Sequence, residues 1–267
     1  MIMKNIRHEL HIALTAWMYF VRVPVPKRLA DKVSFSQHSL ESSARYFTLV
    51  GVMVGLVSGL VFLAALELFA SKPLAILLSM AASIVMTGAF HEDGTADFFD
   101  AFGGGWWSRE RILEIMKDSR IGTFGSVALI LMLLIKFQSL LLIPNGMMLI
   151  ALVGGHALSR LAAGSFLFTH RYVRENDKSY FKPMLKDKGK LSDFVLMAGI
   201  GVVPLFFMGS LWYLLVVPIL ALVTWSFGKY FTSKIGGYTG DCLGATQQIV
   251  EVCFYLSLVL VAKHLAL

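Results

Sequence analysis

Long apolar runs alternate with polar connections along the chain. A helix needs about 20 apolar residues to cross the hydrocarbon core of a bilayer. Runs near that length predict spans at residues 47–69, 74–90, 124–143, 147–168, 192–208, 211–230 and 248–265. An earlier run, residues 6–21, is shorter and stops before the prolines of RVPVPK, so we expect an interfacial or half-inserted helix there. The pattern predicts an all-α, polytopic membrane bundle of about seven spans, with one domain over residues 1–267.

The connections between the predicted spans are of two kinds. Short turns with helix-breaking residues, SKP (71–73), PNG (144–146) and GS (209–210), join pairs of spans into hairpins. The remaining connections are long and carry nearly all the Lys and Arg. When the hairpins are threaded, these basic connections fall on one side, which the positive-inside rule assigns to the cytoplasm. We therefore expect the polar chemistry to face the cytoplasm.

Composition supports the membrane prediction. Of the 267 residues, 57% are hydrophobic and 15% charged, and the mean hydropathy is +0.70, whereas about a quarter of the residues in a soluble domain are charged. The net charge of +7 is explained by basic cytoplasmic loops, and no nucleic-acid-binding motif accompanies it. Two cysteines, Cys242 and Cys253, are too few for a disulfide framework or a tetrahedral metal site.

The acidic segment FHEDGTADFFDAFGGG (residues 90–105) interrupts this apolar chain. In a helix, Asp93, Asp97 and Asp100 lie at i, i+4 and i+7 on one face. Their charges repel unless a cation lies among them, and such oxygen ligands suit Mg²⁺ or Mn²⁺. The alternative is that the carboxylates are merely solvated in a polar loop. Glu92 is a further candidate metal ligand, and His91 is a base, a ligand or an interfacial polar residue.

Two later segments carry related chemistry. The KDSRIG segment (residues 117–122) offers Lys117 and Arg120 as cations for phosphate and Asp118 as a further metal carboxylate; ordinary juxtamembrane snorkelling is its alternative. The glycine segment GGYTGDCLGA (residues 236–245) can form an anion-binding nest of backbone N–H groups, with Asp241 completing a metal shell. Glycine-rich loops are common, so the second signal is weak alone.

Three ionisable residues lie within predicted spans: Lys136, His156 and Arg160. Such residues are costly to bury unless paired, which makes them candidates for function. We expect Arg160 to reach the acidic segment, and Lys136 and His156 to pair with each other or with Glu67. A lysine-rich stretch, residues 176–191, is predicted to be either a lid or a solvated linker.

The segments HEDGTADFFDAFGG, KDSRIGTFG, HRYVR and GGYTGDCLGA, in this order, resemble the cobalamin synthase (adenosylcobinamide-GDP ribazoletransferase) family over nearly the whole chain. Thr48 stands where the family is expected to have proline, a departure that bears on the bend of the first span and not on the chemistry. The resemblance implies a bacterial inner-membrane, Mg²⁺-dependent transferase of cobalamin biosynthesis. It would join adenosylcobinamide-GDP to α-ribazole or its 5'-phosphate and release GMP.

The resemblance and the residue chemistry together give a predicted site. The metal ligands would be Glu92, Asp93, Asp97, Asp100, Asp118 and Asp241. Catalytic roles would fall on His91, Asp93, Lys117 and Arg120. Substrate would be bound by Arg160, Arg171, Gly122, Thr239 and Gly240. Besides substrates and the bilayer, a second copy of the chain and other corrinoid-assembly enzymes are candidate partners; nucleic acid is not.

Two other functions compete with this prediction. A CDP-alcohol phosphotransferase also has an acidic helix at the membrane face, but its DGxxAR motif and later GxxxDxxxD are not matched here. A cation-coupled transporter would place its carboxylates near the middle of broken spans, whereas these lie at the predicted cytoplasmic edge. Release of GMP would separate the synthase from the transporter.

Overall fold

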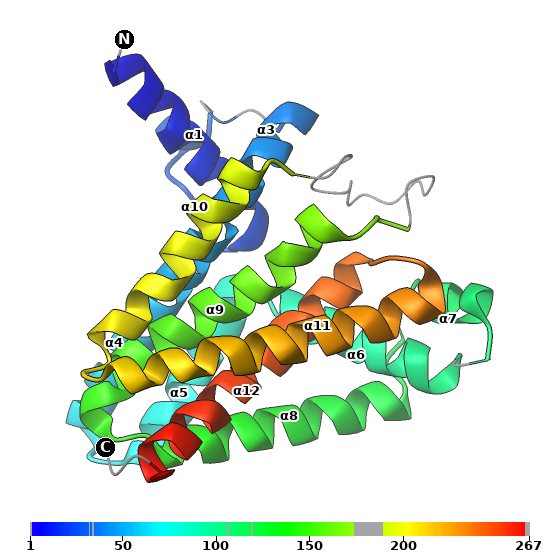
Figure 1. The fold of residues 1–267 in the computed structure, drawn as a ribbon. Helices are drawn as coiled ribbons and strands as arrows, with labels where there is room; N and C mark the ends of the chain where they lie inside the picture. Colours follow the sequence, from blue (N-terminus) through cyan, green and yellow to red (C-terminus); the bar gives the residue numbers. More distant parts are fainter. Residues whose placement is uncertain are drawn as a thin grey trace.

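The protein is a bundle of helices. The computed structural model describes residues 2–31, 33, 35–105, 107–118, 120–173 and 189–264. Within these ranges there are no strands, and the one β-type pairing is an isolated bridge between Tyr172 and Tyr238. The long helices pack side by side, while the start of the chain projects from one side of the bundle (Figure 1). The predicted all-α class is confirmed.

Among the described residues, five helical segments are long and apolar enough to cross a bilayer. Their α-helices are α4 (Phe47–Phe69), α8 (Thr123–Leu142), α9 (Met148–Thr169), α11 (Val216–Ile235) and α12 (Gly240–His264). A sixth span results if α5 (Lys72–Thr87) and α6 (Phe90–Gly104), which meet at 87°, are counted together. The apolar segment formed by α10 (Leu191–Val202) and η3 (Val203–Phe207) is too short to qualify. The described part of the chain thus has five or six candidate spans, where about seven were predicted.

The three predicted tight turns are confirmed, and they gather at one end of the bundle. The first begins at Ala70, which adopts a left-handed conformation after α4. The second contains η2 (Asn145–Met147), and the third lies between η3 and η4 (Leu211–Leu215). Lys72 joins the start of α5 to the end of α8 here, because its Nζ donates to the carbonyl oxygens of Leu141 at 2.8 Å and Ile143 at 2.6 Å. In Figure 1 this end lies at the left, and the connections α6–α8 and α11–α12 lie at the right.

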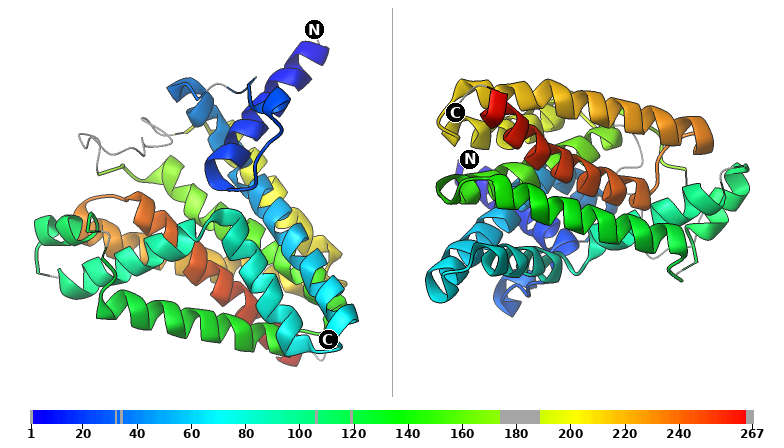
Figure 2. Two further views of the ribbon diagram at one scale, coloured as in Figure 1. Left: turned by 180° about the vertical axis from the view of Figure 1, so that it is seen from behind. Right: turned by 90° about the horizontal axis from the view of Figure 1, so that it is seen from below.

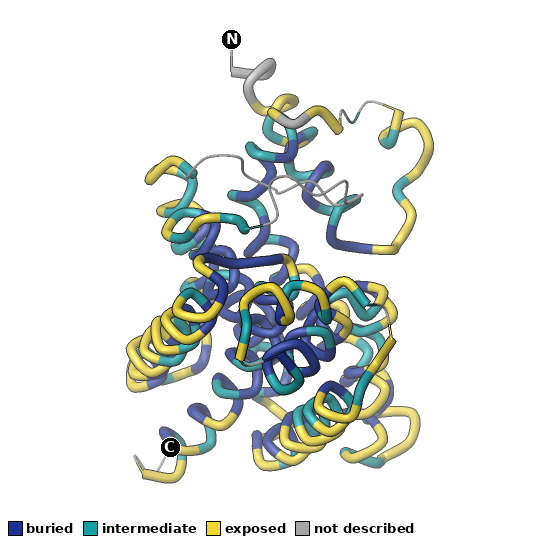
Figure 3. Tube along the Cα trace, turned by 90° about the vertical axis from the view of Figure 1, so that its right-hand side faces the viewer, coloured by how far each residue is buried: buried dark blue, intermediate teal, exposed yellow. Residues whose placement is uncertain are grey.

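Helices α9 and α12 form the centre of the bundle. The most apolar stretch of α9 is 72% buried and that of α12 67% buried, against 22% for both α8 and α11. Figure 3 shows buried residues concentrated in the middle and exposed ones along the outer helices. Because a spanning helix presents its outer face to lipid, the exposed apolar residues of α8 and α11 are expected there. Polar residues inside α9 and α12 must instead find protein partners.

A stripe of glycines lets α4 lie directly against α9. Gly51, Gly55 and Gly59 recur every four residues, so they share one face of α4. A methyl group on Gly55 would lie 2.5 Å from the Cα of Val153, and one on Gly51 would collide with the carbonyl oxygen of His156. Small residues at this spacing are typical of close helix crossings in membranes. The crossing is therefore backbone against backbone.

A sharp bend separates α5 from α6. Gly88 (φ +67°) and Ala89 (φ +56°) both adopt left-handed conformations, and at this point the chain bends by 87° before α6 begins. Arg22 holds the bend from outside: its backbone N–H donates to the carbonyl of Met86 at 2.7 Å, and its side chain lies over Gly88. Seen from behind in Figure 2, α6 leaves α5 at a steep angle. The acidic segment thus turns toward the end of the bundle opposite the tight turns.

The first helix, α1 (Ile2–Phe20), is attached by its polar and aromatic side chains. It is not among the helices long and apolar enough to cross a bilayer. Glu9 accepts from Arg45 at 2.8 Å and from the hydroxyl of Tyr46 at 2.6 Å, and Arg45 also pairs with Asp193 of α10 at 3.3 Å. These contacts attach α1 to the residues just before α4 and, through Arg45, to α10, and its interfacial or half-inserted position stays a prediction.

Candidate functional site

The acidic segment forms α6, as its spacing predicts. Its carboxylates differ in exposure, since Asp93 is exposed, Asp97 is half-buried and Asp100 is buried. Glu92, although adjacent to Asp93, is only 9% exposed. The face predicted to hold metal therefore runs from the surface into the protein.

Asp100 joins α6 to the start of α8. Its Oδ2 accepts from the backbone N–H of Gly122 at 2.6 Å, and its Oδ1 accepts from that of Gly125 at 2.8 Å. A methyl group on Gly122 would lie 2.5 Å from Oδ1, so the glycine allows the carboxylate this close. Carboxylates are favoured at such helix N-termini because the first N–H groups lack partners within the helix. The acidic segment and the KDSRIG segment therefore meet here.

A second junction brings α6 against the first turns of α12. A methyl group on Gly94 would lie 3.2 Å from the Cα of Asp241, and one on Gly244 would lie 3.1 Å from the carbonyl oxygen of His91. The absence of side chains at both glycines lets the two backbones approach. Asp241 therefore lies beside the stretch of α6 that carries Asp93.

Thr239 completes the arrangement. Its hydroxyl is buried, accepts from the backbone N–H of Cys242 at 3.3 Å and lies 3.5 Å from the sulfur of Met116. The first contact caps α12, and the second joins the glycine segment to the residue before Lys117. Gly240 is exposed, with no atom within 4 Å of the position of an added methyl group. The acidic segment thus contacts both the KDSRIG segment and the glycine segment, and the glycine segment contacts Met116, directly before the KDSRIG segment.

The HRYVR segment lies along the glycine segment. The N–H of Tyr238 donates to the carbonyl of Arg171 at 2.9 Å, and the N–H of Val173 donates to that of Tyr238 at 3.1 Å. Arg171 is exposed. Arg174 and most of the predicted lid or linker lie outside the described residues.

The KDSRIG segment presents an ion pair at the surface. Arg120, whose side chain is 87% exposed, donates to Asp118 through Nη2 at 2.6 Å and Nε at 2.9 Å. The hydrogen bond from this guanidinium lowers the pKa of Asp118 to about 2. Lys117 is also exposed. In this structure, then, Asp118 binds the neighbouring cation.

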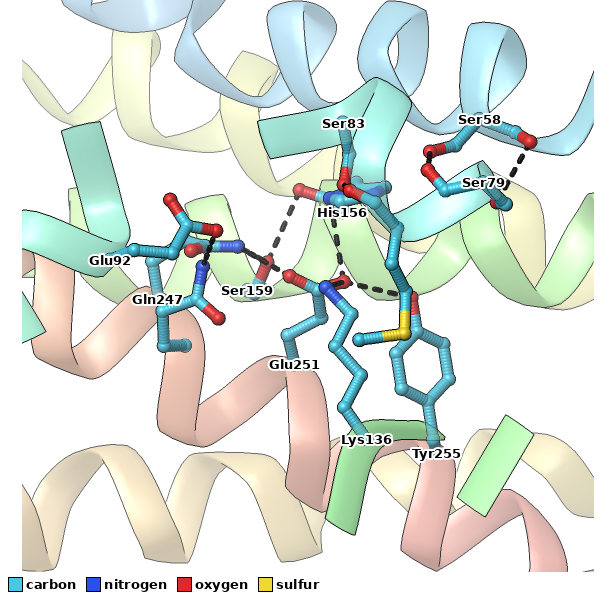
Figure 4. Close-up of polar contacts among 12 residues, drawn as sticks. Ser58, Ser79, Ser83, Glu92, Lys136, His156, Ser159, Gln247, Glu251 and Tyr255 are labelled. Atoms are coloured by element: carbon cyan, nitrogen blue, oxygen red, sulfur yellow. Dashed lines mark hydrogen bonds and ion pairs between the residues drawn. The ribbon is translucent and has the colours of Figure 1, made fainter. Parts of the chain in front are cut away.

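Buried polar side chains between α8, α9 and α12 centre on Glu251 (Figure 4). This carboxylate accepts from Lys136 at 2.6 Å, Gln247 at 2.8 Å and the hydroxyl of Tyr255 at 2.9 Å. His156 Nδ1 lies 3.5 Å from it. Lys136 and His156 therefore share Glu251, and the predicted partner Glu67 is wrong because that residue is exposed. The spacing of Gln247, Glu251 and Tyr255 at i, i+4 and i+8 was the missed signal.

Two further predicted site residues point inward. Arg160 is 1% exposed; its Nη1 donates to the carbonyl of His156 at 3.0 Å, and its guanidinium carbon lies 6.0 Å from the ring centre of Phe47. His91 is 2% exposed, and its ring stacks on that of Phe47 with centroids 6.3 Å apart. Both residues face the interior in this structure.

The donor chemistry of the exposed end fits Mg²⁺. Among the described residues, no group of three or more His, Cys, Asp and Glu side chains is arranged to hold a metal ion. Mg²⁺ commonly binds one or two carboxylates together with substrate phosphates and water, so a complete protein cage is not required. Asp93 and Asp97 lie one turn apart on α6, and Asp241 lies beside Gly94. The metal roles predicted above stay predictions.

Comparison with known proteins decides the family. A family model described as cobalamin-5-phosphate synthase matches residues 12–259. The chain belongs to the cobalamin-5-phosphate synthase family. It is 44% identical to a Shewanella frigidimarina protein over 93% of this chain and 94% of the relative, and 44% identical to a Ralstonia pickettii protein over 94% and 95%. Both relatives are named adenosylcobinamide-GDP ribazoletransferase. No solved structure matches the chain.

Within this cobalamin-5-phosphate synthase family member, the four segments that carry the resemblance lie at one end of the bundle. They comprise α6, the connection that begins α8, the exit from α9 and the start of α12. Figure 1 shows these parts at the end opposite the tight turns. Segments separated by up to about half the chain are thus assembled into one polar surface.

Proposed function

We propose that the protein joins adenosylcobinamide-GDP to α-ribazole or its 5'-phosphate, giving adenosylcobalamin or its 5'-phosphate and GMP. The observation that carries the proposal is that the acidic segment contacts both the KDSRIG segment and the glycine segment, while the glycine segment contacts Met116 directly before KDSRIG. The names of the relatives supply the substrates. The structure brings carboxylates and cations to one end of the bundle, as a pyrophosphate-containing substrate requires.

The reaction is a phosphoryl-group substitution. A free ribose hydroxyl attacks the phosphorus on the cobinamide side of the pyrophosphate, forming one P–O bond as the bond to GMP breaks. The hydroxyl proton must pass to a base. Asp93 and Asp97 are the accessible carboxylates of α6, whereas His91 is buried against Phe47. We therefore assign proton acceptance to one of the aspartates in place of His91.

The exposed cations bind the phosphates in this proposal. Three cations are exposed near the glycine segment: Lys117, Arg120 and Arg171. The backbone of Arg171 binds Tyr238 of that segment, and Lys117 follows Met116, which contacts Thr239. Arg120 is held by Asp118, and its planar guanidinium suits bidentate binding of phosphate oxygens. At Gly240, the N-terminal end of α12 offers backbone N–H groups and open space.

Mg²⁺ held by Asp93 and Asp97, with Asp241 beside them, would neutralise charge on the pyrophosphate and on the departing GMP. Asp100 supports the same site by binding the first turn of α8. By the positive-inside rule, the basic connections at this end support a cytoplasmic orientation, and we propose that the site faces the cytoplasm from the bacterial inner membrane. These assignments are part of the proposal.

The test is GMP release by purified protein in liposomes, supplied with adenosylcobinamide-GDP, α-ribazole 5'-phosphate and Mg²⁺. We expect release by the wild type and a loss of about 100-fold in Asp93→Asn. Glu67→Gln is the matched control, since it removes an exposed carboxylate elsewhere. No release by folded wild-type protein would overturn the proposed function, and full activity in Asp93→Asn would overturn the metal assignment.

A further inference from the structure

Two neighbouring glutamines on α12 bind different parts of the protein. Gln247 and Gln248 are 1% and 3% exposed. Gln247 Nε2 donates to the hydroxyl of Ser159 at 3.0 Å and to Glu251 at 2.8 Å, both within the central helices. Gln248 Nε2 donates to Oε1 of Glu92 on α6 at 2.9 Å. The second glutamine thus connects the centre of the bundle to the acidic segment.

The carboxylate of Glu92 has few other means of support. Its Oε2 is buried and has no hydrogen-bond partner in the part of the chain that the structure describes. Gln248 therefore provides its one side-chain hydrogen bond there. A buried carboxylate is strongly disfavoured without hydrogen bonds, so the Glu92–Gln248 contact restricts where the first turn of α6 can lie.

Rotation of this turn determines where Asp93 points. Successive residues of an α-helix are about 100° apart around its axis, so fixing Glu92 inward fixes the direction of Asp93. The nearby crossing of Gly94 and Gly244 sets the distance between α6 and α12. Glycines have no side chains to interlock, however, and leave rotation to other contacts. No side chain caps the start of α6.

We propose that Gln248 is a positioning residue for the transfer reaction: it holds Glu92 inward and thereby directs Asp93 toward the substrates. This inference rests on the proposed function. It gives Glu92 a role through its hydrogen bond, different from the metal ligation predicted for it. Gln247, of the same residue type and similar burial, serves the central helices instead.

The experiment compares Gln248→Leu with Gln247→Leu in the GMP-release assay, at a temperature at which thermal unfolding shows both to be folded. We expect Gln248→Leu to lower kcat by about 10- to 100-fold, because small misplacements of reacting groups are costly, and to raise the Mg²⁺ concentration for half-maximal rate. Gln247→Leu should keep kcat within about twofold. Should Gln248→Leu not fold, Gln248→Asn, whose amide is shorter by one methylene, is expected to show the same direction of change.

The exchange Glu92→Gln with Gln248→Glu provides a second, independent test. It retains one amide and one carboxylate, so the hydrogen bond can form with its donor and acceptor reversed. We expect the exchange to recover most of the activity lost in Gln248→Leu. A folded but inactive exchange variant would show that position 92 itself needs a carboxylate and would overturn the inference. Equal kcat and equal Mg²⁺ dependence in Gln248→Leu and Gln247→Leu would also overturn the inference. Inactive wild-type protein would instead overturn the proposed function.

Discussion

Asp100 Oδ2 lies 2.6 Å from the backbone nitrogen of Gly122 and accepts its hydrogen bond. This contact divides the aspartates of α6 by role. Asp100 binds the N-terminus of α8 through both oxygens, whereas Asp93 and Asp97 remain accessible at the surface or half-buried. One helical face therefore serves both assembly of the site and the proposed chemistry.

We expect Asp100→Ala to lower the free energy of unfolding by about 1–2 kcal/mol, because α8 loses the carboxylate that binds its first N–H groups. Asp93→Ala is the control from the same face and should change that free energy by less than about 0.5 kcal/mol, since Asp93 is exposed. Denaturant unfolding in detergent measures both. A larger loss in Asp93→Ala would contradict the capping role.

Lys136→Met should destabilise the protein by about 3–5 kcal/mol, because it leaves Glu251 buried without its closest cation. The double change Lys136→Met with Glu251→Met removes both charges and should cost less than Lys136→Met alone. Unfolding measured for both variants in one detergent gives the comparison. Equal losses in the single and double variants would argue against an energetically important pair.

Gly51→Ala should destabilise the α4–α9 crossing by about 1–3 kcal/mol, because the added methyl group would collide with the backbone of His156. Gly199→Ala on α10 is a matched control, since nothing lies within 4 Å of its added methyl group. That control should stabilise the protein by up to about 1 kcal/mol through helix propensity. Thermal unfolding in detergent should show a lower midpoint for Gly51→Ala and an unchanged or higher midpoint for Gly199→Ala. Equal shifts of the two midpoints would contradict the close crossing.

The pairing of Asp118 with Arg120 should be insensitive to pH in the neutral range. The hydrogen bond from Arg120 lowers the pKa of Asp118 to about 2, so the contribution of the pair is complete above the ordinary pKa and is lost as the pH falls through about 2. We expect Asp118→Asn to lower kcat/KM without altering the shape of its profile between about pH 5 and about pH 8. Disappearance of an acidic limb in the variant would contradict this.

Most of the spans and the three tight turns could be predicted from the sequence, because the length of an apolar run and the residues of a turn are local properties. The C-terminal end of the second span could not be predicted in this way. Apolar and small residues continue to Phe90, so the predicted span ran through Gly88, whereas α5 ends at Thr87 and the chain bends. Two consecutive left-handed residues, one of them alanine, leave no reliable signal in a single sequence.

The candidate site, too, could be predicted only where it depends on local sequence. Helical spacing predicted the face formed by Asp93, Asp97 and Asp100. It could not show that Asp100 binds N–H groups 22 and 25 residues away, since that depends on how α6 and α8 meet. Similarly, Lys136 could be recognised as a buried cation, but its pairing with Glu251 depends on which helices are neighbours.

The left-handed pair at Gly88 and Ala89 also limits how the length of this segment can vary. One residue inserted between Ala89 and Asp93 would turn the rest of α6 by about 100° relative to its start. Asp93 and Asp97 would then point about 100° away from their present direction, even though every carboxylate was still present. A relative with a different number of residues between the bend and the first aspartate would need another way to restore that alignment.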